Sequence, residues 1–213
     1  MTPIRIRVRL VNGFVVKDPW SPAIDGIIAA AFMREKLGDD FFTQREADMQ
    51  PVEGLPLATE RHGDRWWYLA SSPAQIGAQG QDKRFFHRRF DDQHEAYLPP
   101  GIGRVMTAAG PYKSSRLYER RAICGGLEWH VIGNEPEIRR LLGTIDQIGG
   151  GRGRGYGQVS EWLYDAGDEA IARRRRPLPV EYAQVIGVTG RVMPWGVVPP
   201  GRIAAAICDC VMP

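Results

Sequence analysis

Six of the nine residues from Gly149 to Gly157 are glycine, and this stretch constrains the fold more than any other part of the chain. Glycine loses more backbone entropy on folding than any other residue and has no side chain to bury, so the stretch cannot be a core element. It does permit positive φ angles and close approach of the backbone to another group. A helix-like segment, residues 135–147, precedes it and a strand-like segment, residues 156–164, follows it. We therefore expect a loop between a helix and a strand.

The side chains of this glycine-rich loop suit nucleic acid. Arg152 and Arg154 place two planar cations on it, and guanidinium is the side chain best matched to phosphate. Tyr156 adds a ring suited to stacking on a base. The loop is not a P-loop, because the helix precedes the glycines, and no G-x-G-x-x-G register fits. We interpret it as a clamp on a nucleic-acid backbone, and the alternative is a flexible connection whose arginines aid solubility. The predicted contacts are Gly149, Gly150, Gly151, Arg152, Gly153, Arg154 and Tyr156.

The balance of basic residues points the same way. The 213-residue chain has 24 Arg but only 4 Lys, although its net charge is a modest +3. Arginine binds phosphate with two parallel hydrogen bonds and stacks on bases, whereas lysine is a point charge. A GC-rich genome would also favour arginine codons, so the bias suggests nucleic acid without requiring it. The length fits one large domain or a domain with a substantial insertion.

The cysteines and the apolar segments indicate the compartment. Cys124, Cys208 and Cys210 make a poor disulfide set, and the C-x-C pair lacks a second pair at zinc-ligand spacing. The chain opens directly into an alternating strand, and the apolar run at residues 27–32 is too short to span a bilayer. We expect a soluble, cytoplasmic protein with structural thiols, no cofactor, no metal and no membrane partner.

Periodicity predicts the first elements. Residues 4–10 alternate apolar residues with arginines, which is typical of a strand with one buried face. The arginines at positions 5, 7 and 9 either protect a sheet edge or face RNA. Ser21 and Pro22 predict a helix start and Gly38 its stop, with Asp25 placed to favour the helix dipole. The expected buried face of this helix is Ile24, Ile27, Ile28, Ala31 and Phe32.

The remaining elements complete a fold class. Residues 57–61 and 65–71 predict a hairpin, and the second of these runs is rich enough in aromatics to be a central strand. A strand at 121–132 and a helix capped by Asn134 at 135–147 follow, and then the last strand. The helix should bury Ile138, Leu141, Leu142 and Ile145. This order predicts an α+β fold with an antiparallel, ferredoxin-like or RRM-like βαββαβ core over residues 1–165.

Two further segments surround this core. Residues 73–120 form a long insertion in which residues 83–90 interleave basic and aromatic side chains, as in proteins that bind single-stranded nucleic acid. A surface hairpin docked by its phenylalanines is an equally good alternative. Residues 166–213 should be an extension packed on the core, with the four arginines at 173–176 either solvated or in contact with phosphate. The candidate contacts in the insertion are Arg84, Phe86, His87, Arg88 and Arg89.

Residues 4–165 resemble the RAMP proteins of CRISPR–Cas systems, which share a βαββαβ core with a glycine-rich loop before the last strand. Within that superfamily, four segments resemble the Cas-five-like subunit of type IV systems: residues 22–29 (PAIDGIIA), 148–157 (IGGGRGRGYG), 176–179 (RPLP) and 198–202 (VPPGR). The related loops often carry a basic residue after the first glycine. Gly150 and Gly151 stand there in this chain, so the arginine that makes the main phosphate contact stays open.

The resemblance implies a function. It predicts a non-catalytic RNA-binding subunit of a type IV effector complex, which grips the 5′ handle of the guide RNA (crRNA) and caps the complex. The insertion would be a thumb-like hairpin. Partners would be the guide RNA and backbone and large-subunit-like subunits, with target DNA within the complex as a further candidate.

The main alternative is a metal-independent, guide-RNA-processing endoribonuclease of the same superfamily. Such chemistry needs a general base near the attacking 2′-hydroxyl, and His62, His87 and His94 are the imidazoles considered, with His87 best placed among arginines. No histidine lies in the first helix, where many of these enzymes keep one. A free-standing RRM-like regulator is a third possibility, but it would not need the insertion or the long tail.

Overall fold

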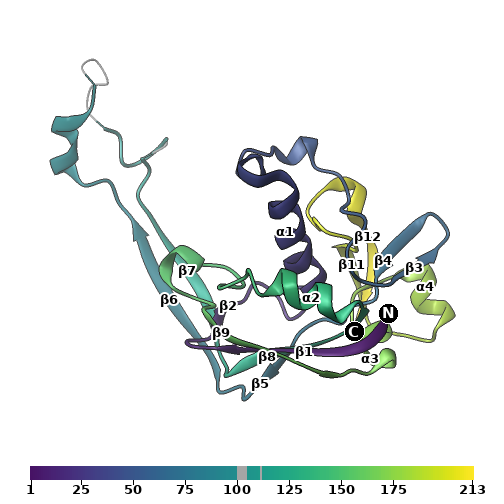
Figure 1. Cartoon of the computed structure of the whole chain (residues 1–213). Coiled ribbons are helices and arrows are strands. Elements are labelled where there is room, and N and C mark those ends of the chain that lie inside the picture. The colour runs from purple at the N-terminus through teal and green to yellow at the C-terminus, as the bar shows by residue number, and fades with distance from the viewer. Residues whose placement is uncertain (100–104, 111) are drawn as a thin grey trace.

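The computed structural model describes residues 1–99, 105–110 and 112–213, and Figure 1 shows the arrangement of its elements. The strands are β1 (Thr2–Leu10), β2 (Phe14–Val15), β3 (Thr59–His62), β4 (Arg65–Tyr68), β5 (Ala74–Ile76), β6 (Gly80–Arg88), β7 (Ser115–Ile123), β8 (Gly126–Gly133), β9 (Val159–Ala166), β10 (Leu178–Pro179), β11 (Arg191–Gly196) and β12 (Ile207–Met212). The α-helices are α1 (Ile24–Leu37), α2 (Glu135–Leu142), α3 (Glu169–Arg174) and α4 (Val180–Val185). Short 3₁₀ turns are η1 (Gly38–Phe42), η2 (Glu46–Asp48), η3 (Asp92–Tyr97), η4 (Arg152–Arg154) and η5 (Ala204–Ala206).

A four-stranded sheet in the order β5-β8-β1-β9 forms the centre of the molecule. Strand β1 is antiparallel to both β8 and β9, and β8 is antiparallel to β5. Helix α1 follows β1 and helix α2 follows β8, and both lie on the same side of the sheet (Figure 1). This order and these directions match a ferredoxin-like βαββαβ core, and the predicted α+β fold class is confirmed.

The alternation in the first strand has the predicted consequence. Ile4, Ile6 and Val8 are fully buried, and α1 packs Ile24, Ile28 and Ala31 into the same core. Ile27 and Phe32 lie at the edge of that core. Helix α2 contributes Ile138, Leu141 and Leu142, with Ile145 packed beside them. The predicted faces of both helices are confirmed.

The predicted helix ends need correction. Helix α1 begins at Ile24 after Ala23, and the Ser21 hydroxyl donates to the Asp18 carboxylate at 3.0 Å instead of capping the helix. Asn134 holds the N-cap position of α2, but its side chain makes no capping hydrogen bond. This helix ends at Leu142 rather than at 147, and the chain continues in tighter turns, in which Thr144 N–H donates to the carbonyl of Leu141 and Ile145 N–H to that of Leu142.

The second core strand is also not where it was predicted. The predicted hairpin exists, but β3 and β4 pair only with each other. Only the end of the predicted strand, residues 69–71, joins β8, through the bridge between Ala70 and Val131 and two flanking backbone hydrogen bonds. Strand β5 takes the edge position instead. Trp67 of β4 packs with Leu178 of the C-terminal extension, so the aromatic run serves a second core rather than the central sheet. The last core strand likewise starts at Val159, later than position 156.

A long hairpin projects from the body. Strands β6 and β7 pair along nine residues each, and β7 also pairs with β2 (Figure 1). Within the segment predicted as an insertion, residues 73–120, Ala74–Ile76 lie in the core sheet as β5, and the hairpin extends to Ile123. Residues 100–104 and 111 of that segment lie outside the described residues.

The C-terminal extension forms a second core with parts of the N-terminal half. Strands β10, β12 and β11 make a three-stranded sheet, and Trp67 is buried among its side chains. Arg176 was expected on a solvated surface or at a phosphate, but it is 5% exposed and lies 3.7 Å from the carboxylate of Asp25. Asp25 lies in the first turn of α1 as predicted, and its carboxylate accepts a hydrogen bond from the N–H of Gly26 at 2.8 Å, but it is buried as well. No helix in the described ranges is long and apolar enough to cross a membrane.

Candidate nucleic-acid interface

The glycine-rich loop is held against the chain's own backbone. Gly150 donates its N–H to the carbonyl of Val15 in β2 at 3.4 Å, and Gly157 donates to the carbonyl of Gly13 at 2.9 Å. At Gly157 φ is +70°, and an added Cβ would overlap the carbonyl oxygen of Ile148. At the base of the loop, the glycines therefore allow the backbone to approach β2 and Ile148 of this same chain.

The tip of the loop is ordered and exposed. Turn η4 is closed by hydrogen bonds from Arg154 N–H to the Gly151 carbonyl and from Gly155 N–H to the Arg152 carbonyl, each 2.9 Å. Asn12 and Gln147 add side-chain hydrogen bonds to carbonyls of the tip, at 2.6 and 3.1 Å. Hydrogen bonds at both ends of the turn are not what a freely flexible connection would have.

The two arginines of the tip are in different environments. The guanidinium of Arg154 pairs with the carboxylate of Glu119 in β7, and it lies 4.2 Å above the ring of Phe86 in β6. Arg152 is exposed, and its side chain makes no ion pair or hydrogen bond with any residue that the structure describes. The charge of Arg154 is therefore already compensated, whereas that of Arg152 is available to a ligand.

The remaining aromatic residue of the loop lies in the joint between loop and hairpin. Tyr156 is partly buried, and its ring lies 6.0 Å from the guanidinium of Arg121 in β7. An added Cβ at Gly151 would come within 2.8 Å of that ring. Tyr156 therefore packs against this chain on one side, and less of its ring is open for stacking than the sequence suggested.

The hairpin has two faces of different composition, because side chains alternate along a strand and directly paired residues share a face. The face that contacts the glycine-rich loop is here called the loop face, and the opposite one the far face. The loop face carries Asp82, Arg84, Phe86, Arg88, Ser115, Leu117, Glu119 and Arg121. The far face carries Lys83, Phe85, His87, Arg116, Tyr118 and Arg120.

These faces separate the predicted contacts of the hairpin. Arg84, Phe86 and Arg88 share the loop face, His87 lies on the far face, and Arg89 follows the strand in an exposed position. The structure thus brings Phe86 and Arg154 together, as a joint site requires, but it does not bring His87 to them.

Acidic residues moderate the charge of the loop face. Asp82 accepts hydrogen bonds from Arg121 at 2.7 Å and from Arg84 at 3.3 Å. The hydrogen bond from Arg121 is the main reason why the pKa of Asp82 is lowered. Ion pairs therefore compensate much of the positive charge on the loop face. Arg152, on the neighbouring glycine-rich loop, has no such partner among the described residues.

The imidazoles are dispersed. His62 lies in the β3–β4 hairpin, at the opposite end of the molecule from β6 and β7, and its ring is 5.8 Å from that of Tyr182 (Figure 1). His94 is in η3, 6.4 Å from the ring of Tyr97. The fourth histidine, His130, is buried in β8, where its Nδ1 accepts from the backbone of Asp168 and its Nε2 contacts Glu128. His130 was not among the predicted candidates, because its only signal in the sequence is its place in an apolar strand.

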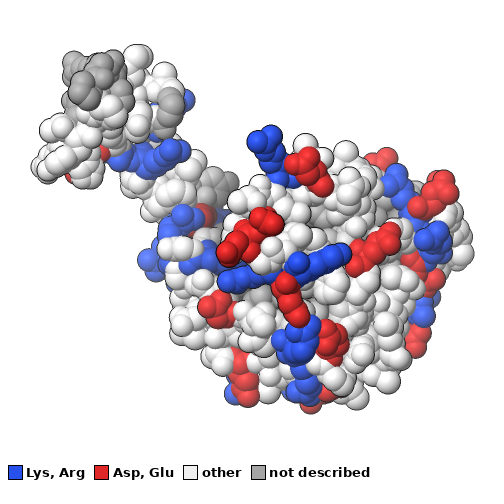
Figure 2. Space-filling model, turned by 45° about the horizontal axis from the view of Figure 1, so that its top comes forward, with Lys and Arg blue, Asp and Glu red and all other residues white. Residues whose placement is uncertain are grey.

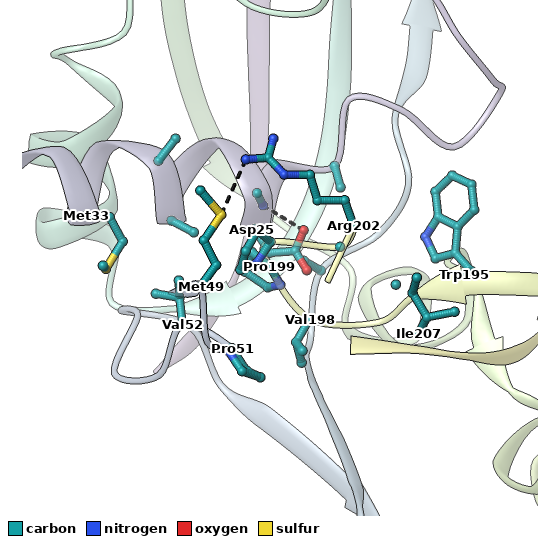
Figure 3. A pocket seen from close by; sticks show the side chains of 18 of the residues that line it. Asp25, Met33, Met49, Pro51, Val52, Trp195, Val198, Pro199, Arg202 and Ile207 are labelled. Carbon is teal, nitrogen blue, oxygen red and sulfur yellow. Dashed lines mark hydrogen bonds between the residues drawn. The ribbon is translucent and has the colours of Figure 1, made fainter. Parts of the chain in front are cut away.

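A large cavity lies on another side of the molecule, between α1, residues 44–53 and the C-terminal extension (Figure 3). Its volume is about 1060 Å³, and its wall includes Met33, Met49, Trp195 and Pro199. The buried carboxylate of Asp25 belongs to this wall, and burial raises its pKa despite the opposing effect of Arg176. Sequence reasoning missed the cavity, although three of the four segments quoted for the resemblance (22–29, 176–179 and 198–202) contribute to it.

The fold and these sites define the class of protein first. The chain is an α+β protein with a ferredoxin-like core, to which a projecting hairpin, a glycine-rich loop docked on that hairpin and a C-terminal extension are added. A family model described as the CRISPR type IV associated protein Csf3 matches residues 2–200, and the chain belongs to this family. The predicted association with type IV CRISPR systems is thereby confirmed. A search of curated proteins found no match.

Proposed function

We propose that this chain is the non-catalytic, Cas-five-like RNA-binding subunit of a type IV CRISPR effector complex, a member of the RAMP superfamily that grips the 5′ handle of the guide RNA and caps the complex. The observation that carries the proposal is Arg152. It is an exposed arginine without a partner among the described residues, on a turn held by backbone and side-chain hydrogen bonds. A positioned guanidinium of this kind suits a phosphate, because less conformational entropy is lost on binding.

The surroundings of Arg152 support an RNA ligand. Arg154 sits between Glu119 and the ring of Phe86, which connects the loop tip to the hairpin, and Arg84 lies on the same face. A strand that follows the corner between loop and hairpin would meet Arg152 first and then the loop face. In this arrangement Arg152 makes the main phosphate contact, and Arg154 positions the tip.

The partners follow from the same proposal. Membership of a type IV CRISPR family implies other subunits of a CRISPR complex. We infer that these are backbone and large-subunit-like proteins, that the guide RNA passes along the loop face, and that target DNA pairs with the guide within the assembly.

The test compares single arginine substitutions. Guide-RNA binding by the full chain is measured by fluorescence anisotropy over a range of salt concentrations. Arg152→Ala should weaken binding and reduce the slope of log K against log salt by about 0.7, as expected for one phosphate contact to a single strand. Arg152→Lys should retain the slope but bind less tightly, because an ammonium cannot bind phosphate with two parallel hydrogen bonds.

Arg174→Ala is the matched control, since Arg174 is an exposed arginine in α3, remote from the loop (Figure 1). It should leave affinity and salt slope unchanged. Wild-type affinity and slope in Arg152→Ala, or an equal loss in Arg174→Ala, would overturn the proposal.

A cleavage assay separates the endoribonuclease alternative. The cognate repeat RNA should stay intact when it is incubated with the full chain and EDTA. His87 lies on the far face of the hairpin, away from Arg152, which gives the alternative less support. Cleavage that disappears in His87→Ala but persists in His62→Ala would replace the binding role with the nuclease role.

A further inference from the structure

The far face of the hairpin is basic and aromatic, and none of its six residues is acidic. All six are exposed. The loop face of the same hairpin, in contrast, contains Asp82 and Glu119. Figure 2 shows Lys and Arg side chains gathered along the stem of the projecting hairpin.

Two aromatic side chains form the centre of this face. Phe85 and Tyr118 are directly opposite each other in the register, their ring centroids are 6.3 Å apart, and they are 51% and 59% exposed. The guanidinium of Arg116 lies 4.2 Å from the Phe85 centroid. Because both rings are largely exposed on a two-stranded projection, they bury little apolar surface and add little to the stability of the fold. Stability therefore does not account for the presence of two aromatic residues here.

Cations lie on both sides of the aromatic pair. Lys83 is directly opposite Arg120, and His87 is directly opposite Arg116. The like charges of Lys83 and Arg120 in directly opposed positions destabilise the antiparallel pair. The side chains of Lys83 and Arg120 make no ion pair with any residue within the described parts of the chain. Three successive cross-strand pairs on this face are therefore basic, aromatic and basic, and no ion pair within the described residues compensates the charges of Lys83 and Arg120.

We propose that the far face is a binding site for single-stranded nucleic acid, separate from the loop face. One base stacks on Tyr118 and another on the ring face of Phe85 that Arg116 does not cover, while Lys83 and Arg120 contact the flanking phosphates. Four residue steps along β6 span about 13 Å, enough for about two or three stacked bases. An acidic protein surface would neutralise the cations but would not use the aromatic pair between them. The proposal does not depend on guide RNA being bound at the loop face.

The experiment measures binding of fluorescein-labelled oligonucleotides of one mixed sequence, made as single-stranded DNA and as RNA, to the full chain. Replacing both aromatics (Phe85→Ala with Tyr118→Ala) should weaken binding about 5- to 150-fold for each base that loses its stacking partner. Phe85→Trp should retain wild-type affinity. Lys83→Ala and Arg120→Ala should each reduce the salt slope by about 0.7. The DNA and RNA arms show which kind of strand the face prefers.

Val192→Ala is the matched control, because Val192 is 51% exposed but lies in β11, outside the hairpin and the glycine-rich loop. It should bind oligonucleotides as the wild type does. All variants should melt within a few degrees of the wild type, since the substituted side chains are exposed. A wild-type affinity in the double aromatic variant, for both DNA and RNA, would overturn the proposal. So would an equal loss in Val192→Ala, or loss of a protein partner in a pull-down without nucleic acid.

The same measurement in an Arg152→Ala background separates this site from the proposed function. If only the guide-RNA proposal fails, Arg152→Ala has no effect on guide RNA, but the aromatic variants still lose the oligonucleotide. If only the far-face proposal fails, guide-RNA binding still depends on Arg152, but the aromatic variants bind the oligonucleotide normally.

Discussion

At the scale of single residues, Arg176 is the clearest connection between the two halves of the chain. Its guanidinium donates to the carbonyls of Tyr68, Ala70 and Val197, and its Nη2 is 3.7 Å from the carboxylate of Asp25. Burial lowers the pKa of Arg176 and raises that of Asp25. The net contribution of a buried ion pair to stability is small, because desolvation offsets the attraction, but the removal of one partner leaves a buried charge uncompensated.

We therefore expect Arg176→Met to lower the free energy of unfolding by about 3–5 kcal/mol. The variant leaves Asp25 without the cation that lowers its pKa, so this pKa rises further above its ordinary value of 3.8. When the pKa of the Asp25 carboxyl is higher in the folded state than in the unfolded state, the free energy of unfolding falls as pH rises. This loss disappears at low pH, where the carboxyl is protonated in both states. The deficit should be smaller at about pH 4.5 than at about pH 7 in urea unfolding. Arg174→Met is the control, and a deficit independent of pH would contradict the explanation.

The cysteines provide a second residue-scale prediction. The Sγ atoms of Cys208 and Cys210 are 3.7 Å apart, and this hydrogen bond is the main reason why the pKa of Cys208 is lowered to about 7. Burial raises the pKa of Cys124. Iodoacetamide should therefore modify Cys208 first, because the thiolate is the reactive form. Cys210→Ala should slow that modification at neutral pH. Peptide mass spectrometry over time would refute this if Cys124 reacted as fast as Cys208.

At the scale of elements, the base of the glycine-rich loop should be less tolerant of substitution than its tip. Gly157→Ala combines a positive φ with overlap of the Ile148 carbonyl, so we expect a loss well above the ~1–2 kcal/mol of the left-handed conformation alone. Gly155→Ala has a φ of +79° but open space, so it should lose only that amount. Thermal melts would reveal both effects.

Gly153→Ala is the control for this series. A Cβ added at Gly153 would meet no atom within 4 Å, and Gly153 does not have a positive φ. It should be close to neutral. Equal stability of all three variants would mean that the loop does not depend on its contacts with Ile148 and Gly13.

At the scale of the whole molecule, the C-terminal extension and the central sheet should unfold together. Trp67 from β4 is fully buried among C-terminal residues, and Arg176 bonds to carbonyls from both regions. The projecting hairpin, in contrast, exposes most of its side chains.

We expect a chain that ends at residue 177 to lose cooperative unfolding and to bind a dye for exposed apolar surface, because Trp67 and its neighbours lose their packing. Replacement of residues 85–118 by Asn-Gly should preserve one cooperative transition, since an Asn-Gly turn closes a hairpin and the body keeps both cores. Calorimetry of both proteins gives the answer. A cooperative transition in the chain that ends at residue 177 would show that the central core folds without the C-terminal extension.

Local patterns determined a large part of this fold in advance. The alternation of residues 4–10, the apolar faces of the two long helices and the order of the core elements all follow from periods that the backbone imposes on its own neighbours. The glycine-rich loop was placed between the second helix and the last core strand for the same reason. Such features depend on residues close together in sequence, so the sequence alone is sufficient for them.

Only the tertiary structure decided which distant residues meet. Asp25 looked like an ordinary first-turn acid and Arg176 like a solvated cation, yet burial joins them across two segments far apart in the chain. The aromatic run at 66–69 satisfied a strand pattern, but its partner proved to be the C-terminal extension rather than the central sheet. The division of the hairpin into a loop face with Phe86 and a far face with Phe85 and His87 depends on strand register and on where the loop docks. Register and docking are set by contacts between segments, and no local period encodes them.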